Sequence, residues 1–236
     1  MSAECVRCGE CCRRSTPALH QEDLDLIGGS DGLDLVHLVT FRRGELVRDQ
    51  VRGVLAPLDQ EVVKLRSARD SWACMFLVDR DGRAGCARYE ARPLECRLLL
   101  CKDPRALAEA YGVGRVTRND IIGPRGRLAE LVQAHEAQCG YEELAAFARR
   151  FHCDSSDTAA AKALLAAVHF DSRARELVCE RLRDKRAEER AAVAACVLGR
   201  PLPETMTMFG LAVVEQATGG LGLVARGTSH HPAARP

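Results

Sequence analysis

The N-terminal part of the chain is organised by the stretch CVRCGECC at residues 5–12. Its cysteines follow the pattern Cys-x2-Cys-x2-Cys-Cys, and the two-residue spacing lets successive thiolates bend toward one ion while backbone N–H groups point at the sulfur atoms. Zinc knuckles and iron–sulfur loops both use this geometry. Gly9 permits the unusual backbone dihedral that such a turn often needs. The adjacent side chains of Cys11 and Cys12 are expected to diverge, so that they serve two centres or leave a spare thiol.

A second cysteine motif, CARYEARPLECR, occupies residues 86–97. Pro93 presets the first turn of a short helix that would present Cys96. Cys74 opens an expected strand before this motif, and Cys101 follows it. The first 101 residues thus hold eight cysteines, more than the four that a single zinc ion accepts. They could fill one cubane cluster with spare thiols, or two separate centres.

The N-terminal sequence, the net charge and the apolar stretches indicate which classes of protein this chain does not belong to. The N-terminus has no apolar segment of a secretion signal, so a reducing, cytoplasmic location is expected and the cysteines point to metal rather than to disulfides. Lys and Arg number 34 against 33 Asp and Glu, a formal net charge of +1, which argues against a nucleic-acid partner. No apolar stretch is long enough to cross a bilayer, so no membrane association is expected.

Together the two motifs resemble the CxxCxxCC family of zinc- or iron-chelating proteins, the YkgJ-type cysteine-cluster proteins. The resemblance covers Cys5 to about Cys101, and it includes Tyr89, Arg92, Pro93 and Arg97 in order. It implies metal binding by a set of chelating cysteines: Cys5, Cys8, Cys11, Cys12, Cys74, Cys86 and Cys96, with Cys101 as a further candidate. Flagellin lysine N-methylases are similar in carrying such a cysteine set beside a helical region.

An iron–sulfur centre, with 4Fe–4S favoured, is the interpretation preferred over zinc. The reasons are the excess of thiols and the absence of a histidine from either motif. Zinc stays open as the alternative, because four-cysteine zinc sites are common. Hydrogen bonds and positive charge tune such a centre, and the candidates for that role around the cofactor are Tyr89, Arg92 and Arg97.

The fold class expected is mainly α: an irregular cysteine-rich module of short helices, with a possible small hairpin, packed on a C-terminal helical bundle. The domain prediction assigns residues 1–104 to the metal-binding module, 105–218 to the helical domain and 219–236 to a mobile tail.

Local patterns predict individual elements. Short helices are expected from Thr16 to Ile27 and around 31–41, and short strands near 46–47, 62–63 and 75–78, the last before a turn at 79–82. Apolar residues at helical spacing predict helices ending near Gly140 and Phe151, then helices over 158–170, 172–198 and 203–218.

Three functions compete at this point. The protein could use a metal or iron–sulfur centre for a redox role, or it could be an enzyme that modifies a protein side chain, similar to flagellin lysine N-methylase. It could also be an interaction module in which zinc holds loops together while the helical domain binds a protein partner. The four later cysteines, Cys139, Cys153, Cys179 and Cys196, sit mostly on helical stripes and are expected to pack.

Overall fold

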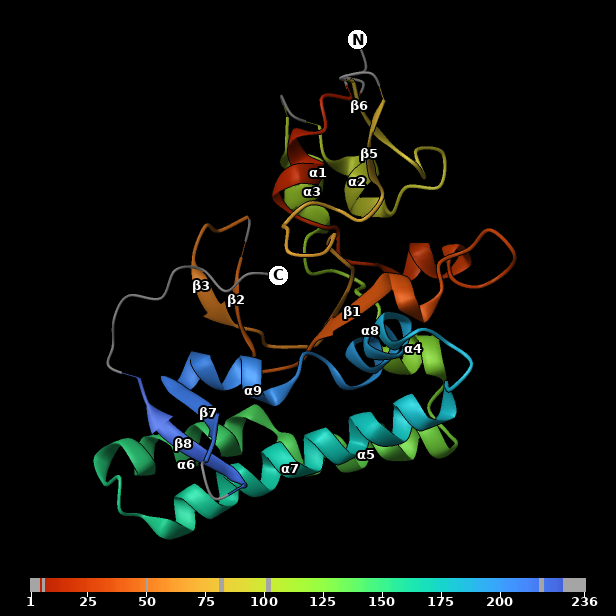
Figure 1. Ribbon diagram of the computed structural model, residues 1–236. Coiled ribbons are helices and arrows are strands. Elements are labelled where there is room, and N and C mark those ends of the chain that lie inside the picture. Colours follow the sequence, from red (N-terminus) through yellow and green to blue (C-terminus); the bar gives the residue numbers. More distant parts are fainter. Residues whose placement is uncertain are drawn as a thin grey trace.

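The computed structural model describes residues 5, 7–49, 51–80, 83–100, 103–216 and 219–226. Figure 1 shows the cysteine-bearing elements at one end and the long helices at the other, with β1 and α8 between them. Among the described helices, none is long and apolar enough to cross a membrane.

The N-terminal part consists of short elements linked by antiparallel pairs. β1 pairs with β4, so that Leu38 faces Leu65 in register, while β2 pairs with β3 and β5 with β6. The elements in chain order are α1 (Glu10–Arg14), η1 (Gln21–Leu26), η2 (Leu35–His37), β1 (Leu38–Phe41), β2 (Leu46–Arg48), β3 (Leu55–Pro57), β4 (Val62–Leu65), β5 (Leu77–Arg80), β6 (Arg83–Cys86), α2 (Leu94–Leu98), α3 (Arg105–Ala110) and α4 (Arg118–Ile122).

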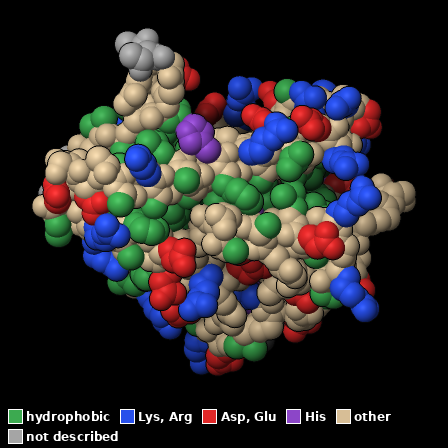
Figure 2. Space-filling view, turned by 90° about the horizontal axis from the view of Figure 1, so that it is seen from below, with side chains coloured by type: hydrophobic (Ala, Val, Ile, Leu, Met, Phe, Trp, Pro, Cys, Tyr) green, Lys and Arg blue, Asp and Glu red, His purple; other side chains and the backbone are tan. Residues whose placement is uncertain are grey.

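The C-terminal part packs longer helices and ends in a hairpin. In it β7 and β8 pair antiparallel, with Leu211 opposite Ala225. The elements are α5 (Arg127–Cys139), α6 (Tyr141–Cys153), α7 (Thr158–Arg181), α8 (Ala187–Leu198), α9 (Leu202–Thr205), η3 (Met206–Phe209), β7 (Leu211–Glu215) and β8 (Leu221–Ala225). On the face formed by this end, acidic and basic side chains are interspersed around hydrophobic ones (Figure 2).

The expectation of a mainly α fold is wrong. Within the described residues the chain forms four two-stranded antiparallel sheets beside its helices, so the fold is mixed. Three sheets lie in the cysteine-rich part, where β-branched and aromatic residues such as Val39, Phe41 and Val63 favour extended chain. The fourth is β7–β8. Of the helix predicted over 203–218, only α9 and η3 are helical; β7 follows them, and β8 lies in the segment predicted as a tail.

Other boundaries also differ from the sequence patterns. The predicted helices over 158–170 and 172–198 are instead α7, which runs through to Arg181, and a separate α8. The predicted helix around 31–41 is the 3-10 turn η2 followed by β1, and only η1 is helical between Thr16 and Ile27. Strands at 46–47 and 62–63 and the helices ending near Gly140 and Phe151 are confirmed.

Buried polar contacts fasten the two parts together. Arg118 on α4 donates to Glu61 before β4 at 2.6 Å and to Glu136 on α5 at 2.7 Å. Its guanidinium also donates to the carbonyl oxygen of Val197 on α8 at 3.0 Å. Thr40 on β1 donates to the carbonyl oxygen of Cys196. These contacts hold β1 and β4 of the cysteine-rich part against the helices.

Candidate metal centre

In the first cysteine motif, α1 begins directly after Gly9, a position that has no room for a side chain. Gly9 has φ +74°, and a Cβ there would lie 2.5 Å from the Cβ of Ala84 on β6. Only glycine accepts both the left-handed backbone and this close approach. The turn therefore seats α1 directly against β6, which ends at Cys86.

The neighbouring cysteines of α1 do not diverge as the sequence predicted. The sulfur atoms of Cys11 and Cys12 lie 3.8 Å apart, close enough for one thiol to donate to the other. This contact lowers the pKa of Cys11 to about 6, an effect that the charge of Arg92 reinforces, and it raises the pKa of Cys12. Cys11 is therefore the thiol of this pair that ionises readily, and thiolate is the form that binds metals.

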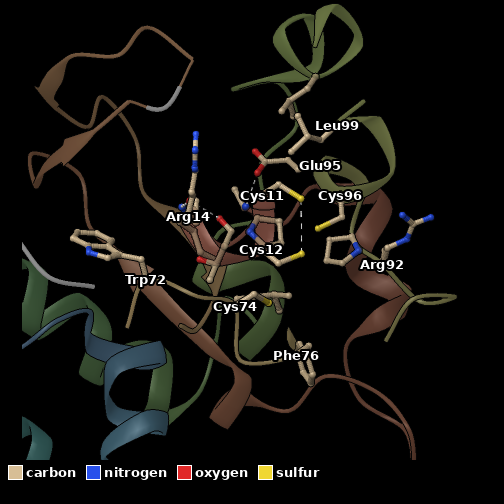
Figure 3. A pocket seen from close by; sticks show the side chains of 18 of the residues that line it. Cys11, Cys12, Arg14, Trp72, Cys74, Phe76, Arg92, Glu95, Cys96 and Leu99 are labelled. Carbon is tan, nitrogen blue, oxygen red and sulfur yellow. Dashed lines mark hydrogen bonds between the residues drawn. The ribbon is translucent and has the colours of Figure 1, made fainter. Parts of the chain in front are cut away.

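Cys74 and the two cysteines of the second motif reach the same place from three separate segments of the chain. The N–H group of Cys74 donates to the carbonyl oxygen of Cys12 at 2.7 Å. Cys86 ends β6, and Cys96 lies on α2, which begins directly after Pro93 as the sequence predicted. Figure 3 shows the sulfur atoms of Cys11, Cys12 and Cys96 pointing toward one another, with Cys74 beside them.

Seven of the eight predicted ligands line one cavity of about 1040 Å³: Cys5, Cys8, Cys11, Cys12, Cys74, Cys86 and Cys96. The eighth, Cys101, lies outside the described residues. Burial raises the pKa of Cys96, and the neighbouring thiols of Cys74, Cys11 and Cys86 raise it further. Burial likewise raises the pKa of Cys74. These thiols are therefore close enough to oppose each other's ionisation, a repulsion that a bound cation would relieve.

The donor set fits zinc or iron in its chemistry. Thiolates are the soft ligands that both structural zinc and iron–sulfur clusters take. Within the described part of the chain, however, no group of three or more His, Cys, Asp or Glu side chains is already placed to hold a metal ion together.

The predicted charge-tuning residues divide into two groups. The guanidinium carbons of Arg7 and Arg92 lie 3.7 Å and 3.8 Å from the centre of the Tyr89 ring, and Arg92 also donates to the Tyr89 carbonyl oxygen at 2.8 Å. Tyr89 and Arg92 line the cavity. Arg97 instead lies 3.7 Å from the buried carboxylate of Asp23 and is not among the residues of the cavity wall.

Glu95 and Lys64 are among the side chains of this cavity that sequence reasoning missed. Glu95 accepts from the N–H group of Ala18 at 2.7 Å and lies 3.4 Å from the ring of His20. These two contacts anchor α2 and so position Cys96. Its place next to Cys96 was a signal that could have drawn attention to it. Lys64 carried no such signal, because it sits on β4 among apolar residues.

The four later cysteines lie outside this cavity wall. Cys139 and Cys196 are buried in hydrophobic clusters, where burial raises the pKa of each to about 12. Cys153 is exposed at the end of α6, and Cys179 is half-buried on α7. Cys139 and Cys196 therefore behave as packed thiols.

Comparison with known proteins agrees with the chemistry of the cavity. Residues 4–113 match the family model CxxCxxCC, described as "Putative zinc- or iron-chelating domain". The matched region contains all the cavity cysteines and extends to the turn after α3. Neither the comparison with curated proteins nor that with solved structures gave a match.

Proposed function

Because residues 4–113 carry the CxxCxxCC zinc- or iron-chelating domain, metal binding is the premise from which we propose a finer function: the thiols hold an iron–sulfur centre with a redox or catalytic role. The observation that carries the proposal is the convergence of seven cysteines from α1, β6, α2 and their flanking loops on one cavity. A single zinc ion needs four of them.

Charge around the cavity supports a centre with several thiolates. Arg7 and Arg92 stack on Tyr89 beside the thiols, and Arg13 donates to the carbonyl oxygen of Cys8 at 2.9 Å. Cationic groups at this range stabilise bound thiolates and raise the reduction potential of a cluster. When bound, an iron–sulfur centre would supply one-electron chemistry or a Lewis-acidic iron.

The decisive experiment measures iron, zinc and acid-labile sulfide per chain in protein purified without oxygen. We expect about four irons with matching sulfide, or a multiple of this, and a brown colour that bleaches with dithionite. One or two zinc ions without sulfide would contradict the iron–sulfur proposal. It would favour instead a domain whose loops are held together by zinc, which would lose structure when chelator is added.

Variants identify the ligands. Cys8→Ala, Cys86→Ala and Cys96→Ala are each expected to lose metal and stability together, because each removes a thiol from the cavity. Cys179→Ala is the matched control, since this cysteine lies on α7 outside the cavity wall, and it should keep full metal content. Full metal content in Cys8→Ala would show that the ligand assignment is wrong.

A further inference from the structure

The cavity that holds the thiols continues past them between α3 and the hairpin β2–β3. Its wall there is apolar and includes Val47 and Leu55 from the hairpin and Leu107 from α3. Leu55 is 58% exposed, and Trp72, which also lines the cavity, is 42% exposed. Figure 3 shows Trp72 on the opposite side of this view from Cys96. The space is large enough for a small organic molecule as well as a metal centre.

Two cations face this part of the cavity without matching anions. Within the described residues Lys64 Nζ lies 3.5 Å from Ser15 Oγ and 5.9 Å from the centre of the Phe41 ring, and it forms no ion pair. Burial lowers the pKa of Lys64. Arg115 stacks on Tyr111, with the guanidinium carbon 4.5 Å from the ring centre, and its buried Nε has no hydrogen-bond partner among the described residues. Lys64 and Arg115 flank one segment of the chain, because Ala18 forms a β-bridge with Lys64 and His20 forms one with Arg115. The charge of Arg115 lowers the pKa of Lys64 further. Unpaired, mutually repelling cations in a cavity favour an anionic ligand.

The carboxylates nearby are already engaged. Glu95 raises the pKa of Lys64, but both of its oxygens have other partners, the N–H group of Ala18 and the ring of His20. Another arginine of the wall, Arg200, is paired with Glu45 at 2.6 Å. Within the described residues no ion pair therefore joins Lys64 or Arg115 to a carboxylate.

We propose that this part of the cavity binds a small carboxylate with an apolar body. Arg115 and Lys64 hold the carboxylate, while the body lies along Val47, Leu55 and Leu107 and extends toward the thiols. The fork of an arginine matches a carboxylate, and a lysine adds a point charge. A monoanion suits this place better than a dianion, because apolar walls make every further charge costly to desolvate. The site does not depend on which metal the thiols hold.

The test uses the full metal-loaded chain and three probes in isothermal titration calorimetry: decanoate, decanol and acetate. Decanoate has both the charge and the apolar body, whereas each of the others lacks one of them. We expect decanoate to bind at least tenfold more tightly than either. Because Trp72 is the only tryptophan, its fluorescence should change on decanoate binding and so report the location.

Variants then assign the head group site. Lys64→Met and Arg115→Gln should each weaken decanoate binding at least tenfold, with metal content and circular dichroism unchanged. Lys162→Met, at an exposed position on α7, should not. Having two separate variants keeps the test valid if one of them misfolds. Equal binding of decanol and decanoate, or decanoate binding that survives both variants, would overturn the proposal. Tighter binding of decyl phosphate than of decanoate would overturn the choice of a monoanionic carboxylate.

Discussion

His135 Nε2 lies 2.8 Å from the carboxylate of Asp171, and both side chains are almost completely buried. Asp171 on α7 also accepts from Arg175 and from the N–H group of Leu202, so it joins α5, α7 and the start of α9. The other ring nitrogen of His135 is buried and has no partner within the described residues. A proton added there would have no acceptor, so the neutral ring, donating from Nε2, is the stable form.

Acid should therefore destabilise the protein in two stages. Burial lowers the pKa of His135 from 6.5 and the charge of Arg42 lowers it further, against the opposing effects of Asp171 and Glu136. The stability that depends on neutral His135 is fully present above pH 6.5 and is lost as the pH falls below it. Burial would raise the pKa of Asp171, but its bonds to His135 and Arg175 outweigh burial and lower it to about 2. Its contribution, about 2 kcal/mol, is lost from pH 3.8 downward.

Urea unfolding at a series of pH values checks this prediction, with His135→Gln as the comparison. The free energy of unfolding should fall more steeply in the unchanged protein than in the variant between about pH 7 and pH 5. Other histidines titrate equally in both proteins, so the difference between the curves isolates His135. If the free energies of unfolding of the two proteins changed in parallel over this pH range, the pKa of His135 would not be lowered by folding.

Gly9→Ala tests whether the close contact between α1 and β6 supports the metal centre. Gly29→Ala is a matched control, because both glycines have φ +74° but a Cβ at position 29 would meet no atom within 4 Å. Gly29→Ala should cost about 1 kcal/mol from backbone strain alone. Gly9→Ala should cost about 2 kcal/mol more and should reduce metal content, because α1 must move away from Ala84. Equal effects of the two substitutions on unfolding and metal content would show that the contact is unimportant.

The sequence predicted the gathering of the cysteines because their spacing is a local property. Cys-x2-Cys turns and a proline before a short helix bend the chain within a few residues, and Cys96 duly lies on α2. The hydrogen bond from Cys74 to Cys12 joins residues far apart in the chain, and no local pattern encodes it. Lys64 and Arg115 were missed for the same reason, since tertiary packing alone brings them together.

The errors in the fold have equally specific causes. Helical spacing continues through the charged residues near Arg181, and neither glycine nor proline marks the break before α8. The break occurs where Glu189 accepts from the N–H group of Arg186 and so caps the new helix. At 203–218 the apolar residues suit either structure, and Gly210, with φ +69°, ends η3 and turns the chain into β7.

Substitution of Tyr89 tests the stacked arginines beside the thiols. Tyr89→Leu removes the ring on which Arg7 and Arg92 lie, whereas Tyr89→Phe keeps it. Each stacked cation contributes about 0.5–1 kcal/mol at a partly exposed site, so Tyr89→Leu should release metal to a chelator several-fold faster. Tyr89→Phe should stay within about twofold of the unchanged protein. Equal rates of metal release from all three proteins would show that Tyr89 does not stabilise the metal centre.

Arg118 should make the cysteine-bearing part and the helices unfold together. Its guanidinium is buried and bonded to Glu61 on one side and to Glu136 and Val197 on the other. Arg118→Met would leave Glu61 without its cation and Glu136 with Arg42 alone, at 3.5 Å, and should lower the free energy of unfolding by about 3 kcal/mol.

Urea unfolding of the metal-loaded protein checks this, with Trp72 fluorescence reporting the cysteine-bearing part and far-ultraviolet circular dichroism reporting mainly the helices. In the unchanged protein the two signals should coincide, whereas in Arg118→Met they should separate. Arg127→Met, at an exposed position at the start of α5, should leave them coincident. Separate transitions already present in the unchanged protein would show that the two parts are independent folding units, because the buried contacts of Arg118 would then contribute too little free energy to couple them.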